Sequence, residues 1–65
     1  MTELSIILPT YNEKGNIIIL VNKIIKLLKN YKKKEIIIVD DSSPDNTYDL
    51  VKNEFRAKKF IRIFS

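Results

Sequence analysis

The sequence predicts an α/β fold in which secondary structure alternates as strand–helix–strand–helix–strand. Short apolar runs end in polar loops at residues 9–13 (PTYNE) and 40–45 (DDSSPD). Amphipathic segments with helical spacing separate these runs. Connections of this length favour parallel pairing and right-handed crossovers. Because parallel strands place ligands beyond their carboxyl ends, we expect the two loops to face each other across one crevice.

The first strand is expected over residues 4–8, where Pro9 stops it. A helix should begin between residues 13 and 16, with Asn12 or Asn16 as its cap. Apolar residues recur in it at three- and four-residue spacing, which predicts one buried helix face. That face consists of Ile17, Leu20, Val21, Ile24, Leu28 and Tyr31, and is widened by Ile18 and Ile25.

The second strand is expected over residues 36–39. Its four consecutive β-branched residues predict a strand that is covered on both faces. The acidic stretch that follows should be a loop, because it is rich in turn-forming residues. A second helix, capped by Asn46 or Thr47, should run to about Arg56, and residues 60–64 predict a third strand. The apolar residues of the second helix are Tyr48, Leu50, Val51 and Phe55.

The composition excludes several kinds of site. The chain has no cysteine and no histidine, which excludes disulfides, thiolate metal sites and a histidine base. The net charge is +4, and residues 32–34 (KKK) are the densest basic part. We interpret these lysines as a solvated helix end rather than a contact with an anionic membrane. Aromatic residues do not alternate with basic ones, so we expect no nucleic-acid partner.

The loops are also poor in glycine, which limits how a phosphate can be bound. Gly15 is the only glycine, so neither a dinucleotide fingerprint nor a P-loop is present. Any nucleotide must therefore be held by side chains. Tyr11 offers a flat face to a base, and Glu13 can bond a base or a ribose hydroxyl. Asp40 and Asp41 can accept N–H groups of a base, but we expect only one to do so and the other to hold the loop.

Each loop also has a purely structural explanation when it is taken alone. Residues 40–45 are typical of an Asx turn, Tyr11 is typical of a packed side chain, and residues 12–13 are typical of a helix cap. The two loops together, each at the end of a β-like run, favour a binding site.

Residues 5–13 (SIILPTYNE) and 37–47 (IIVDDSSPDNT) resemble the start of the family 2 glycosyltransferases. The second segment is similar to the polyprenol-phosphate sugar transferases, of which dolichol-phosphate mannosyltransferase is the best-known type. The resemblance spans the chain, and it implies that residues 1–65 are the N-terminal nucleotide-sugar-binding portion of a larger domain. The βαβαβ unit would then be half of the Rossmann-like sheet of a GT-A fold.

The resemblance also implies roles for individual residues. Asp41 would hydrogen-bond the base of the nucleotide, and Asp40 would support the loop. Asn46 stands where this branch often has glycine, and asparagine tolerates the left-handed region of backbone space. The nucleotide-binding residues carried over by position are Pro9, Tyr11, Glu13, Val39, Asp40 and Asp41.

The reaction implied by the resemblance is transfer of a hexose to a lipid phosphate at the cytoplasmic face of a membrane. GDP-mannose is the favoured donor and UDP-glucose the next, and a UDP-sugar used for glycan synthesis is a further alternative. The family implies Mg²⁺ or Mn²⁺ held by an Asp-x-Asp motif, which this sequence lacks. We therefore expect no catalytic residue and no activity in these residues alone. A nucleotide-binding module without catalysis, and an α/β protein with two structural loops, remain alternatives.

Overall fold

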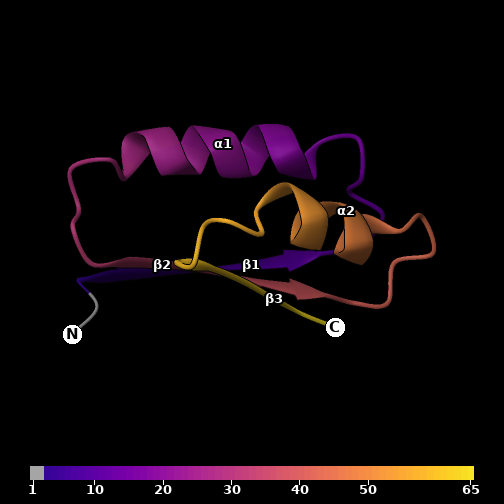
Figure 1. Cartoon of the computed structure of the whole chain (residues 1–65). Helices are drawn as coiled ribbons and strands as arrows, with labels where there is room; N and C mark the ends of the chain where they lie inside the picture. Colours follow the sequence, from indigo (N-terminus) through magenta and orange to yellow (C-terminus); the bar gives the residue numbers. More distant parts are fainter. Residues whose placement is uncertain (1–2) are drawn as a thin grey trace.

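The computed structural model describes residues 3–65 and has the predicted βαβαβ order (Figure 1). The domain expected over residues 1–65 therefore includes two residues that lie outside the described part. Neither described helix is long and apolar enough to cross a membrane. The elements are β1 (Leu4–Thr10), α1 (Ile17–Leu27), β2 (Lys34–Asp40), α2 (Thr47–Glu54) and β3 (Ile61–Phe64).

The three strands form one parallel sheet in the order β1-β2-β3. Because parallel crossovers are right-handed, two crossovers that step in the same direction place both helices on one face. Figure 1 shows α1 and α2 on the same side of the sheet. On the opposite face Ile7 is 66%, Val39 42% and Phe64 47% exposed. The prediction that the second strand is covered on both faces is therefore wrong for residues 3–65.

The hydrophobic core lies between the two helices and the covered face of the sheet. Ile36 and Ile38 of the central strand are fully buried there. In the first helix the buried stripe is narrower than predicted, because Leu20 and Tyr31 are exposed. Tyr31 lies beyond the end of α1 at Leu27. The buried core residues are Ile17, Val21, Leu28, Ile36, Ile38, Val51 and Phe55.

The first strand continues through Pro9 to Thr10, so the prediction that proline stops it is wrong. The carbonyl oxygen of Thr10 accepts a hydrogen bond from the backbone N–H of Asp41 at 2.9 Å. The backbone polar groups of Thr10 therefore point toward β2. Its neighbour Pro9 then directs its nitrogen, which carries no hydrogen, toward the open edge of the sheet. Proline is tolerated at such an edge position because no ladder hydrogen bond is lost.

The helix caps also differ from the prediction. Asn16 before α1 and Asn46 before α2 make no side-chain cap bond. At α2 the carboxylate of Asp45 instead accepts the backbone N–H of Thr47 at 3.1 Å. The remaining differences are at element ends. The first helix ends at Leu27, so residues 32–34 are not its end as predicted, and β2 extends from Lys34 to Asp40. The second helix ends at Glu54 and β3 begins at Ile61.

Asn46 has the left-handed backbone conformation (φ 66°, ψ 26°), in keeping with the glycine that the resembling sequences often have there. A β-branched residue there places its Cβ against the following carbonyl oxygen. We expect Asn46→Val to lower the free energy of unfolding by about 1–2 kcal/mol. Asn46→Gly should change it by less than about 0.5 kcal/mol, since glycine adopts this conformation freely. Urea unfolding of both variants tests this, and equal destabilisation by valine and glycine would contradict it.

Candidate functional site

The two polar loops leave the sheet side by side. Thr10 at the end of β1 is the register partner of Asp40 at the end of β2, and Figure 1 shows both loops at the same end of the sheet. The loops are hydrogen-bonded directly to each other. The backbone N–H of Asn12 donates to Oγ of Ser43 at 2.9 Å, and that of Lys14 donates to Oδ2 of Asp45 at 3.2 Å. The loops therefore form one connected unit.

Asp40 is the centre of this unit. The residue is only 2% exposed. Its Oδ1 accepts the hydroxyl of Thr10 at 2.9 Å and the hydroxyl of Ser43 at 2.5 Å. Its Oδ2 accepts the backbone N–H of Ser43 at 2.9 Å. Asp40 thus joins the end of β1 to the loop after β2, and its carboxylate is occupied by the protein itself.

The hydrogen bonds to Asp40 also set its ionisation. Burial acts to raise the pKa of the Asp40 carboxyl. The hydrogen bonds from the hydroxyl and the N–H of Ser43 and from the hydroxyl of Thr10 favour the charged form and outweigh burial. The net result is a pKa below the ordinary aspartate value.

Asp45 has a similar role at the start of the second helix. Its carboxylate accepts the N–H and the hydroxyl of Thr47, besides the N–H of Lys14 from the other loop. The hydroxyl of Thr47 is the main cause of a lowered pKa at Asp45. Asp45 therefore fixes the start of α2 relative to the loop after β1.

Acid should destabilise the protein through these two carboxylates. A carboxyl whose pKa is lower in the folded state stabilises the fold above its unfolded pKa of about 3.9, and this contribution is lost as the pH falls through the folded value. We expect the urea concentration at the midpoint of unfolding to decrease as the pH is lowered below about 4. The fall should be smaller in Asp40→Asn than in the matched variant Asp41→Asn. An identical acid response in both variants would contradict the assignment.

Asp41 differs from Asp40 in its exposure and in the hydrogen bonds of its carboxylate. It is exposed, and its carboxylate makes no hydrogen bond to any residue in the described part of the chain. Only its backbone is engaged, through the N–H that donates to Thr10. Of the two adjacent aspartates, Asp40 supports the loop and Asp41 is available to a ligand.

The other candidate residues surround the same end of the sheet. Pro9 and Val39 are register partners, and both are exposed on the face without helices. Tyr11 is exposed in the loop after β1. Glu13 is half-buried, and its carbonyl oxygen accepts the N–H of Ile17 at the start of α1 at 2.8 Å. The structure brings Pro9 and Val39 together, while the side chains of Tyr11 and Glu13 make no hydrogen bond within residues 3–65.

Sequence reasoning missed Thr10, Ser43 and Asp45. The turn-forming residue types were visible in the sequence. The partners were not, because the hydrogen bonds from Thr10 to Asp40 and from Lys14 to Asp45 join residues about 30 positions apart. The strand register that brings them together is set by the fold.

The acidic side chains near the loops do not form a metal site. Among residues 3–65 no three His, Cys, Asp or Glu side chains are grouped so that they could hold a metal ion. Asp40 and Asp45 are engaged in hydrogen bonds within the loops. The residues present therefore do not fit the Mg²⁺ or Mn²⁺ site that the sequence resemblance implies.

Comparison with known proteins shows which family of proteins the chain is similar to. The sequence model described as "Glycosyl transferase family 2" matches residues 5–65. The chain is 46% identical over 46 residues (68% of the chain, 14% of the relative) to "Dolichyl-phosphate beta-glucosyltransferase" of Saccharomyces cerevisiae. It is 45% identical over 49 residues (72% of the chain, 13% of the relative) to "Dolichol-phosphate mannosyltransferase" of Pyrococcus furiosus.

A third relative aligns along almost the whole chain. It is "GalNAc(5)-diNAcBac-PP-undecaprenol beta-1,3-glucosyltransferase" of Campylobacter jejuni, 42% identical over 66 residues (98% of the chain, 20% of the relative). The chain thus spans no more than 20% of the length of any of these three relatives. No solved structure matches the chain. The match over residues 5–65 shows that this chain belongs to glycosyl transferase family 2.

Proposed function

We propose that this chain forms the nucleoside-binding part of an enzyme that transfers a hexose from a nucleotide-diphosphate sugar to a polyprenyl or dolichyl phosphate. The observation that carries the proposal is the free, exposed carboxylate of Asp41 beside loops that Asp40 and Asp45 hold in place. The names of the relatives, which include dolichyl-phosphate glucosyl and mannosyl transferases, support this donor and acceptor chemistry.

The candidate residues suit the parts of a nucleoside. Pro9 and Val39 offer a small apolar surface on the uncovered face of the sheet. Tyr11 can place its ring against a base, and aromatic rings stack on any base because every base has a π face. Glu13 can accept a hydrogen bond from a ribose hydroxyl. Asp41 can accept N–H groups from the edge of the base, which is the contact that distinguishes one base from another.

Mannose, supplied by GDP-mannose, is the favoured hexose in this proposal. Guanine presents two N–H donors on adjacent atoms, and both oxygens of a free carboxylate can accept them together. Uracil presents one such donor, so UDP-glucose is the second choice. The carboxylate of Asp41 has both oxygens available among the described residues, which favours guanine.

Two further parts of the proposal concern the full enzyme. Family 2 enzymes commonly use a divalent metal, but the described residues lack a suitable group of ligands. We therefore expect the 65-residue chain alone to transfer no sugar. Since the acceptor would be a lipid phosphate, we propose that the enzyme works at the cytoplasmic face of a membrane.

The test is a titration of the 65-residue chain with GDP and with UDP, followed by NMR chemical shifts. We expect shifts at the two loops and tighter binding of GDP. Asp41→Asn should weaken GDP binding by about 10- to 100-fold, because hydrogen bonds to a charged group are worth about 1.5–3 kcal/mol. Asp49→Asn, which removes the same charge from an exposed position on α2, should have little effect. Equal affinity in the Asp41 variant and the unchanged chain would refute the proposal.

A further inference from the structure

A second surface of the chain, outside the two loops, combines a hollow with a strong positive charge. A cavity of about 330 Å³ lies between α2 and β3. Half of its ten lining residues are basic and none is acidic. The lining is therefore strongly positive, in a chain whose net charge is +4. We call this surface the basic hollow. Its charged residues are Lys52, Arg56, Lys58, Lys59 and Arg62.

The base of the basic hollow is apolar. Val51 of α2 and Phe55, which directly follows α2, are buried at its helix side, and Ile61 and Ile63 of β3 are half-buried at its strand side. A volume of about 330 Å³ is at the lower end of the range for ligand pockets, roughly 300–1,000 Å³. The hollow therefore has room for one phosphate group with the short apolar part that is attached to it.

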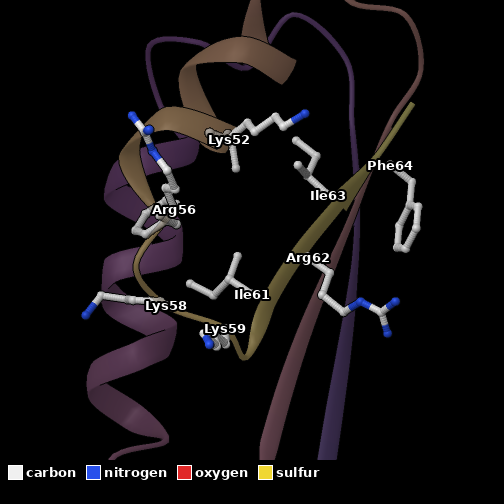
Figure 2. Close-up of a pocket in the computed structure, with 10 residues that line it drawn as sticks. Lys52, Arg56, Lys58, Lys59, Ile61, Arg62, Ile63 and Phe64 are labelled. Atoms are coloured by element: carbon white, nitrogen blue, oxygen red, sulfur yellow. The ribbon is translucent and has the colours of Figure 1, made fainter.

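The charged groups stand around this apolar base. Figure 2 shows Lys52 reaching from α2 over Ile63, and Lys59 beside Ile61 at the other end of the hollow. Arg62 extends to the opposite side of β3 in the same view. Lysine side chains at such places keep their stems on apolar surface and their charged ends in water. Lys52 and Lys59 thus mark the two ends of the hollow.

Most of these cations have no acidic partner within the described residues. The ion pair found in residues 3–65 joins Arg62 and Glu35, whose N–O distance is 3.6 Å. Lys52 lies over the ring of Tyr48, 5.5 Å from its centre, and this contact leaves the charge uncompensated. Four like charges around one hollow repel each other, and an anion placed among them removes that repulsion.

We propose that the basic hollow binds an anionic phospholipid at a bilayer surface. The lipid phosphate would lie between Lys52 and Lys59, and its glycerol and first methylene groups would contact the aliphatic base. Lys and Arg side chains that lie close to an anionic membrane surface gain about 1 kcal/mol each. A nucleic-acid partner would need exposed rings on which bases can stack. The ring at the base, Phe55, is buried, and the other lining ring, Phe64, points to the far side of β3 in Figure 2.

The test is co-sedimentation of the 65-residue chain with vesicles. We expect binding to vesicles of phosphatidylcholine and phosphatidylglycerol in equal parts, and none to phosphatidylcholine alone. Lys52→Gln/Lys59→Gln should weaken the partition by about 25-fold, roughly fivefold for each lysine. The matched control Lys23→Gln/Lys26→Gln removes the same charge from exposed positions on α1 and should weaken it by less than about fivefold. Circular dichroism checks that both variants fold.

Four outcomes would overturn the inference. Equal losses in the two double variants would mean that net charge alone drives binding. Equal binding to the neutral vesicles would exclude an anionic lipid, and tighter binding of a single-stranded oligonucleotide through Lys52 and Lys59 would show a nucleic-acid site. NMR shifts with a short-chain phosphatidylglycerol should fall at Ile61 and Ile63, and inorganic phosphate that reproduces them at equal affinity would show a free-anion site.

The inference stands apart from the proposed nucleotide site. Asp41→Asn should leave vesicle binding unchanged, and Lys52→Gln/Lys59→Gln should leave the affinity for GDP unchanged. Each proposal can therefore fail without the other.

Discussion

Asp40→Ala is expected to lower the free energy of unfolding by about 3 kcal/mol, which is most of the stability of a domain of this size. The substitution removes the acceptor of three hydrogen bonds, which come from the hydroxyl of Thr10 and from the hydroxyl and N–H of Ser43. Thr10 is buried, so its hydroxyl loses its partner where water does not readily replace it. A buried donor without a partner costs about 1–3 kcal/mol. Urea unfolding followed by circular dichroism measures the loss.

The matched control is Asp41→Ala, one residue further along the chain. It removes the same charge from an exposed carboxylate that bonds to no described residue. Surface substitutions of this kind change stability by no more than about 0.5 kcal/mol. The two variants should therefore separate stability from binding: Asp40→Ala unfolds the chain, and Asp41→Ala leaves it folded without its affinity for GDP. Equal stability of the two variants would show that Asp40 does not hold the loops.

The order of the elements was predictable because each depends on local sequence. The helical spacing from Ile17 to Leu28 and the β-branched run of residues 36–39 specify their own secondary structure. The left-handed conformation of Asn46 followed instead from the family resemblance, in which glycine often stands at this position. The continuation of β1 through Pro9 was not, because it depends on β1 being at the edge of the sheet.

The coverage of the sheet could not be derived from β2 alone. Its four β-branched residues show that the strand is apolar on both faces, but the directions of the two crossovers decide where the helices lie. Both crossovers step the same way, so Ile36 and Ile38 are buried while Val39 is exposed. The run of β-branched residues therefore predicted the parallel sheet correctly, but its prediction that both faces of the sheet are covered was wrong.

The candidate site shows the same division between local and long-range information. The acidic loops and their places after β1 and β2 followed from the sequence. The different positions of Asp40 and Asp41 follow from strand alternation, which turns the first toward the helices. The bonds of Ser43 and Asp45 to the first loop required the register of the strands.

Ile38→Ala is expected to have an effect of the same order as Asp40→Ala, through packing rather than hydrogen bonding. Ile38 has no exposed surface and lies on the covered face of the central strand, within the cluster that includes Val21 of α1 and Val51 of α2. Truncation of a buried isoleucine to alanine costs about 2–5 kcal/mol, because the lost contacts leave a cavity. We expect this variant to be largely unfolded at 25 °C, as measured by circular dichroism.

Two further variants keep this prediction measurable. Ile38→Val removes one methylene group and should lower the free energy of unfolding by about 1 kcal/mol, within the range of urea titration. Ile7→Thr changes an apolar residue that is 66% exposed on the other face, keeps its β-branched shape, and should change stability by less than about 0.5 kcal/mol. If Ile7→Thr destabilises the chain as much as Ile38→Val, the uncovered face contributes to stability as the core does. That result would contradict a core confined to the helix-covered side of the sheet.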